Sequence, residues 1–77
     1  MKDLLKMIGQ EIRVRREALN YTQPDLAELT NISERTIRSI EQGSGTNLKN
    51  IIKILDVLGL TLKVTLKPLN DETGESL

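Results

Sequence analysis

The sequence predicts an all-α domain, a compact bundle of four to five helices, followed by one C-terminal β-strand. Apolar residues recur at helical spacing, cap residues bracket two short helices between 22 and 43, and strict alternation begins at residue 60. We therefore expect a helical domain over residues 1–59, a dimerisation strand over 60–68 and a disordered acidic tail over 69–77.

The composition excludes several classes of function. A chain of 77 residues allows one small domain with a thin core, which oligomerisation commonly supplements. It has no cysteine and no histidine, so thiol nucleophiles, the usual zinc ligand sets and the commonest general base are missing. We expect no enzyme, cofactor or metal. The sequence lacks a membrane-spanning stretch and a secretory pattern, so we expect a soluble, cytoplasmic protein.

Charge is unevenly distributed along the chain. The net charge is zero, from 11 basic and 11 acidic residues. Asp71, Glu72 and Glu75 lie in the last eight residues, which contain no Lys or Arg. The rest of the chain has eleven basic against eight acidic residues, a balance of +3. A mildly basic body permits DNA binding without proving it.

The first helix is expected from about Leu5 to Leu19, after a short lead-in. Its apolar stripe consists of Leu5, Ile8, Ile12 and Leu19. Arg13, Arg15 and Arg16 form a basic cluster in this segment. The cluster either lies near a phosphate backbone or is an ordinary solvated face, and the sequence leaves both interpretations open.

Start and stop signals then bracket two short helices joined by a tight turn. Thr22 is a natural N-cap, and Asp25 completes a capping-box pattern. Asn31 suits a left-handed helix end, Ser33 offers a second N-cap, and Gly43 closes the second helix.

The second of these helices has a polar outer face. At about 100° per residue, that face spans an arc of roughly 140°. Its members are Glu34, Arg35, Arg38, Ser39 and Gln42. Ile37 and Ile40 lie on the opposite side. Arginine is well suited to bidentate contact with guanine edges and phosphates. Any exposed helix face is polar, but the double cap and the tight turn favour a DNA-reading helix.

A last helix is expected after the Ser44-Gly45 link, with Thr46 as its N-cap and Gly59 at its end. Its apolar stripe consists of Leu48, Ile51, Ile54, Leu55 and Leu58. Thr46, Asn47 and Lys49 crowd the N-terminus of this helix, where backbone N–H groups favour an anion. Plain capping is the rival explanation for Thr46.

Alternation of apolar and polar residues predicts one strand at the end of the domain. Its apolar members are Leu60, Leu62, Val64 and Leu66. A lone strand cannot satisfy its backbone groups within one subunit. Pairing with the same strand of a second copy would give a two-fold homodimer. The alternative is a disordered, sticky tail.

The motif Thr22-Gln23…Leu26-Ala27…Ser33…Thr36-Ile37…Ile40-Glu41…Gly43 resembles the helix-turn-helix of lambda-repressor/Cro-like (XRE) regulators. The resemblance covers roughly residues 5–60, and the C-terminal segment resembles that of HipB-like antitoxins. It implies that Arg16 pairs with Glu41, and that Gln23 binds a phosphate and braces the recognition helix. It also implies that the corner around Thr46 touches the DNA backbone.

A dimer of this kind would place two recognition helices in successive major grooves. The expected operator is a near-palindrome of double-stranded DNA with half-sites about 34 Å apart. Base-edge contacts are expected from Ser33, Glu34, Arg35 and Arg38, with Ser39 at the margin. Glu34 would accept from a cytosine amino group, and Arg35 or Arg38 would read guanine. Backbone contacts are expected from Gln23, Thr36, Thr46, Asn47 and Lys49.

The resemblance implies a DNA-binding repressor, the antitoxin of a type II toxin–antitoxin operon that represses its own promoter. Its partner would be a protein toxin, such as a HipA-like kinase. A stand-alone regulator of phage or restriction-modification type would use the same DNA contacts without a toxin. A third hypothesis is a protein-interaction adaptor that has lost DNA binding, for which the near-zero net charge is the only support.

Overall fold

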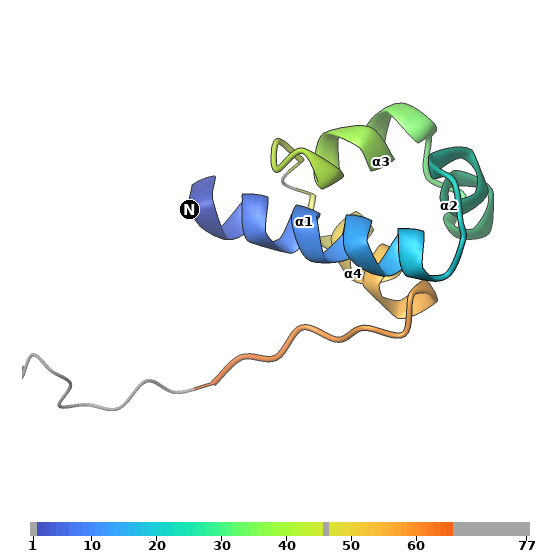
Figure 1. Ribbon diagram of the computed structural model, residues 1–77. Helices are drawn as coiled ribbons and strands as arrows, with labels where there is room; N and C mark the ends of the chain where they lie inside the picture. The colour runs from blue at the N-terminus through green and yellow to red at the C-terminus, as the bar shows by residue number, and fades with distance from the viewer. Residues whose placement is uncertain (1, 46, 66–77) are drawn as a thin grey trace, which may run out of the picture.

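A computed structural model describes residues 2–45 and 47–65, and this part of the chain forms four α-helices. They are α1 (Lys2–Ala18), α2 (Gln23–Thr30), α3 (Glu34–Glu41) and α4 (Leu48–Val57). α3 lies along α1 and runs roughly opposite to it, α2 lies beyond one end of both, and α4 lies behind α1 (Figure 1). None of the described helices is long and apolar enough to cross a membrane.

One apolar core lies where these helices meet. Its buried members are Ile12, Leu26, Ile32, Ile37, Ile40, Ile51, Ile54, Leu55 and Leu58. Every helix contributes, so the inward faces expected for α3 and α4 are confirmed. Leu19 was expected in the apolar stripe of α1 and Leu48 in that of α4, but both are exposed. Leu19 lies past the end of α1, and Leu48 is the first residue of α4.

The cap signals around α2 and α3 are confirmed. The Thr22 hydroxyl accepts from the Asp25 N–H at 3.1 Å, and the Asp25 carboxylate accepts from the Thr22 N–H at 2.9 Å. Asn31 has a φ of 58°, and Gly43, just past α3, has a φ of 84°. The Ser33 hydroxyl accepts from the backbone N–H of Thr36 at 3.1 Å. These contacts fix the turn between the two helices.

Two helix starts differ from the prediction. α1 begins at Lys2 rather than near Leu5, with Asp3 in its first turn, where a carboxylate favours the helix dipole. α4 is capped by Asn47, whose side chain accepts from the Asn50 N–H at 3.1 Å. The expectation that Thr46 caps this helix is therefore wrong. Thr46 itself lies outside the described residues.

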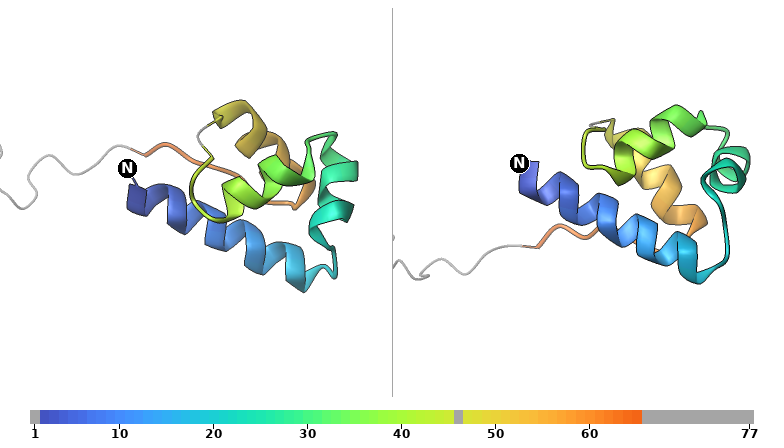
Figure 2. Two further views of the ribbon diagram at one scale, coloured as in Figure 1. Left: turned by 90° about the horizontal axis from the view of Figure 1, so that it is seen from above. Right: turned by 45° about the horizontal axis from the view of Figure 1, so that its top comes forward.

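After α4 the chain turns back at Gly59, which has a φ of 75°. Residues 60–65 then run in an extended path beside α1, toward its N-terminus (Figure 2). These residues form no strand, because a strand needs a partner and the described part of the chain offers none. Pairing across a homodimer stays a prediction. Leu66 and the expected tail over 69–77 lie outside the described residues.

Candidate nucleic-acid interface

The outward face of α3 is the polar surface that the sequence predicted. Arg35, Arg38 and Gln42 are exposed, while Ile37 and Ile40 are buried in the core. In Figure 1 this helix lies at the edge of the molecule, with no other element over its outer side. A helix in this position can enter the major groove of DNA, which admits an α-helix.

Two of the charged side chains on this face are paired with each other. Arg38 Nη2 donates to Glu34 Oε2 at 2.9 Å, and both side chains are about half exposed, at 50% and 44%. They stand four residues apart, so they lie one above the other on the helix surface. Arg35 forms no ion pair within the described residues. Arg38 therefore meets a ligand with one donor already bound to Glu34, whereas Arg35 meets it without such an ion pair.

A buried ion pair holds α3 against α1. Arg16 Nε donates to Glu41 Oε2 at 2.6 Å and Arg16 Nη2 donates to Glu41 Oε1 at 3.0 Å, with side chains only 9% and 4% exposed. Arg16 Nη1 also donates to the Tyr21 carbonyl at 2.8 Å. The hydrogen bond to Glu41 raises the pKa of Arg16 above its ordinary value, although burial opposes the shift. The pairing that the family resemblance implied is confirmed.

Gln23 joins the same cluster from the first turn of α2. Its Nε2 donates to Glu41 Oε1 at 3.1 Å, so this side chain braces α3 as the resemblance implied. Gln23 is only half-buried, which leaves part of it facing solvent at the N-terminus of α2. Its contact with a phosphate stays a prediction.

The three arginines of α1 do not form one basic surface. Arg13 pairs with Glu17 at 3.2 Å, and Arg15 Nε donates to the Leu58 carbonyl at 2.8 Å. Arg16 pairs with Glu41. Each side chain thus has a partner within the chain, and Glu17 on α1 also lies 3.9 Å from Arg16. The geometry favours a structural role for this cluster over a phosphate contact.

Several predicted contact residues stand at helix starts and already make local hydrogen bonds. The hydroxyls of Ser33 and Thr36 lie 2.9 Å apart, in addition to the cap that Ser33 provides. Asn47 caps α4, and Lys49 in its first turn is exposed. Ser39 is partly exposed on α3. These groups border the α3 face, but their contacts with DNA stay predictions.

Gly9 positions the recognition helix, and sequence reasoning missed it. A Cβ at this buried position would lie 2.5 Å from the Glu41 carbonyl oxygen, and closer still to that of Ile40. The end of α3 therefore rests directly on the backbone of α1. A glycine inside an otherwise helical pattern was the signal available in the sequence.

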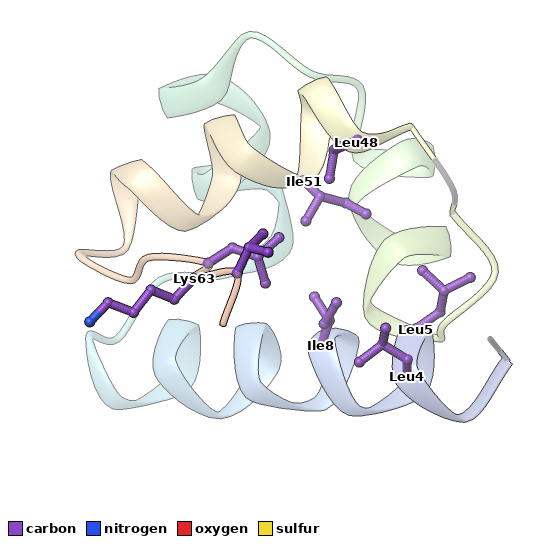
Figure 3. Close-up of a pocket in the computed structure, with 8 residues that line it drawn as sticks. Leu4, Leu5, Ile8, Leu48, Ile51 and Lys63 are labelled. Atoms are coloured by element: carbon purple, nitrogen blue, oxygen red, sulfur yellow. The ribbon is translucent and has the colours of Figure 1, made fainter. Parts of the chain in front are cut away.

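An apolar groove lies away from this face, between α1, α4 and the extended segment (Figure 3). Its lining includes Leu4, Leu5, Ile8, Leu48, Ile51 and Leu62. Leu4, Leu48 and Leu62 are exposed, and Val64 at the edge of the groove is 97% exposed. The groove therefore leaves several large apolar side chains exposed to solvent.

The comparison with known families decides the class of the protein. Residues 12–64, from the second half of α1 to beyond α4, match the helix-turn-helix family. The chain belongs to this family. The resemblance to lambda-repressor/Cro-like regulators is confirmed at that level, and membership of the HipB-like subgroup stays a prediction.

One relative carries a functional name. The "Putative HTH-type transcriptional regulatory protein" of Archaeoglobus fulgidus is 33% identical over 55 residues, which are 71% of this chain. The match covers 18% of that protein, so this chain spans less than a fifth of its length. The similarity is therefore confined to one segment of that protein.

Proposed function

We propose that this helix-turn-helix chain is a sequence-specific transcriptional repressor that binds double-stranded DNA. The observation that carries the proposal is the open polar face of α3, with Arg35 and Arg38 exposed on it and Glu41 fixed behind it by Arg16. The relative named as a transcriptional regulator supports the same role. Specific recognition needs such a rigid support, because side chains must meet base edges at defined angles.

In this proposal α3 lies in the major groove. Arg35 and Arg38 read guanine through its O6 and N7 atoms. Glu34 stands beside them at the start of the helix. Contacts from the surrounding helix starts fix the register on the phosphate backbone, which is how most protein–DNA hydrogen bonds act. This group comprises Gln23, Thr36, Thr46, Asn47 and Lys49, while Ser33 and, at the margin, Ser39 contact base edges.

We further propose that the repressor acts as a homodimer. The apolar groove and the unpaired extended segment support this, because a second copy would cover exposed Leu62 and Val64 and pair the backbone of residues 60–65. The dimerisation strand would then consist of Leu60, Leu62, Val64 and Leu66 with their polar neighbours. Two recognition helices would meet half-sites about 34 Å apart.

Selection from a random library of double-stranded DNA tests the function. We expect the full chain to enrich a near-palindromic site, because a two-fold dimer reads the same half-site twice. Binding should weaken steeply as salt is raised, since phosphate contacts release counterions. If no sequence is enriched over the starting library, the proposal of sequence-specific repression is wrong.

The resemblance to HipB-like antitoxins supports a narrower proposal, that a protein toxin binds the repressor. Co-expression with the product of the adjacent gene tests this, with the mass of the purified species as the readout. A heteromeric complex that still binds the shared promoter supports the antitoxin role. A homodimer that binds the promoter alone overturns it in favour of a stand-alone regulator.

A further inference from the structure

We propose that Glu34 is a positioning residue for Arg38 and not itself a base reader. The carboxylate holds the guanidinium in one direction, so that Arg38 meets a single guanine in the major groove. This inference rests on the proposed DNA-binding function. It replaces the expectation that Glu34 accepts a hydrogen bond from a cytosine amino group.

The geometry of the pair supports this assignment. Arg38 Nη2 lies 2.9 Å from Glu34 Oε2. Residues four apart on a helix differ by about 40° in direction, so both side chains point to the same side of α3. The contact uses one of the five N–H donors of the guanidinium. The remaining donors suffice for a bidentate contact with guanine O6 and N7.

Charge makes a direct role for Glu34 unfavourable. A carboxylate in the major groove meets phosphates and mostly acceptor atoms, namely N7, O6 and O4, and only the amino groups of cytosine and adenine donate to it. Arg38 offsets the charge of Glu34 in the free protein. Drawing the carboxylate toward a cytosine would weaken its contact with Arg38. The cost rises when DNA excludes water from the groove.

Arg35 provides the contrast on the same helix. It is exposed and has no acidic partner among the described residues. Its guanidinium keeps its full choice of directions, so it can adapt to a base or to a phosphate. Arg38 gives up part of that freedom to its contact with Glu34. A side chain held in advance loses less conformational entropy on binding and rejects a misplaced base more strongly.

The Glu34–Arg38 pair alone is weak in water, since an exposed ion pair at this spacing favours the paired over the unpaired side chains by only about twofold. Its effect on DNA recognition is expected to be larger, because the groove removes solvent from both groups. Removing only Glu34 leaves a mobile arginine. Removing only Arg38 leaves a carboxylate without a partner, facing the acceptors of the groove.

Base-by-base affinity measurements test the inference. The operator is first selected with the full wild-type chain. Affinities for it and for every single base-pair variant are then measured for wild type, Glu34→Gln, Arg38→Ala and the double variant. We expect Arg38→Ala to lose roughly 5- to 150-fold of discrimination at one base pair. Glu34→Gln should lose at least about threefold at that same base pair, and the double variant no more than Arg38→Ala.

Glu34→Gln should at the same time bind random DNA as tightly as wild type or more tightly, because it removes a negative charge near the phosphates. A loss of specificity together with unchanged or increased general affinity distinguishes positioning from a merely structural effect. Glu34→Asp keeps the charge but shortens the side chain. It should lose discrimination at the same base pair, since the shorter carboxylate cannot hold Arg38.

The chain offers a matched control pair in α1. Arg13 and Glu17 stand four residues apart at 3.2 Å and are similarly exposed, at 57% and 54%. Arg13→Ala therefore repeats the charge change of Arg38→Ala away from α3, whereas Glu17 also lies 3.9 Å from Arg16 and is left unchanged. We expect Arg13→Ala to leave the preference at every base pair unchanged, and circular dichroism should show that all variants remain folded.

Two results would overturn the inference while leaving the proposed function intact. One is a Glu34→Gln variant that keeps full discrimination. The other is a loss at a different base pair from that of Arg38→Ala, with additive effects in the double variant, which would make Glu34 a base reader. If the wild-type chain selects no site, the proposed function itself fails, and that outcome is distinct from both.

Discussion

Arg16 lies at the junction of three elements. Its guanidinium contacts the end of α3 through Glu41 and the loop before α2 through the Tyr21 carbonyl. A buried charge of this kind is tolerated only when its hydrogen bonds are satisfied. The guanidinium of arginine stays charged in proteins, and the hydrogen bond to Glu41 raises the pKa of Arg16 further in that direction.

Removing one member of this buried pair should be costly. We expect Arg16→Ala to lower the free energy of unfolding by about 3–5 kcal/mol, since it leaves the Glu41 carboxylate buried without its partner. Urea titration measures the change. Arg13→Ala, which removes an exposed arginine, should cost less than about 0.5 kcal/mol. Equal losses for the two variants would contradict the role of the buried pair.

Arg35 is the residue whose loss should affect recognition most simply. We expect Arg35→Ala to weaken binding to the selected operator by about 1–3 kcal/mol and to relax the preference at one base pair. Titrations with the operator and with random DNA measure both effects. Equal losses on the two DNAs would mean that Arg35 contacts only the backbone.

At the residue level the sequence predicted the caps and the inward residues well, because each depends on local chemistry. Thr22, Asn31 and Ser33 have the backbone and side-chain contacts expected of them. The pairing of Arg16 with Glu41 spans 25 residues and came only from the family resemblance. The pairing of Glu34 with Arg38 was open to sequence reasoning, since opposite charges stood at helical spacing.

Close contact between α1 and α3 depends on Gly9. We expect Gly9→Ala to destabilise the domain by about 1–3 kcal/mol, because the added Cβ would overlap the carbonyl oxygens that end α3. On a helix surface with no packing neighbour, the same change would stabilise the domain by about 1 kcal/mol. The sign of the change in stability therefore shows whether α3 packs against Gly9. Thermal unfolding measures it.

Gln10→Ala provides the control for this experiment, because Gln10 is the exposed neighbour of Gly9 on α1. It should be neutral or slightly stabilising. A Gly9→Ala variant that melts at or above the wild-type temperature would show that α1 and α3 do not meet at this position.

Helix boundaries were the least predictable feature at the scale of elements. Thr46 and Asn47 are adjacent and both are good N-caps, so the sequence could not choose between them, and Asn47 is the cap. α1 begins three residues earlier than expected at Leu5, because Leu4 and Asp3 continue the helix. These shifts leave the recognition face of α3 unchanged.

At the scale of the whole molecule the extended segment is the feature that a single chain cannot explain. Residues 60–65 carry the alternating pattern of a strand but have no strand partner among the described residues. If the partner is a second copy of the chain, its contacts form only on association and therefore depend on the protein concentration. The sequence predicted a strand paired with a second copy, and that pairing stays a prediction.

Truncation tests the dimer. We expect deletion of residues 61–77 to convert the dimer to a monomer, measured by analytical ultracentrifugation. Leu60 is kept, because its N–H donates to the Leu55 carbonyl at 2.8 Å and closes α4. Deletion of residues 69–77, which spares the predicted strand, should leave the dimer intact. An unchanged mass for the longer deletion would refute strand pairing.

The central claim is that the outward face of α3 is the DNA interface. Amide chemical shifts of the full chain, recorded with and without the selected operator, test it most directly. We predict the largest changes in residues 34–42 and at Gln23, with small changes around Val14 on α1. Large changes confined to the apolar groove around Leu4 and Leu62, with α3 unaffected, would contradict the account.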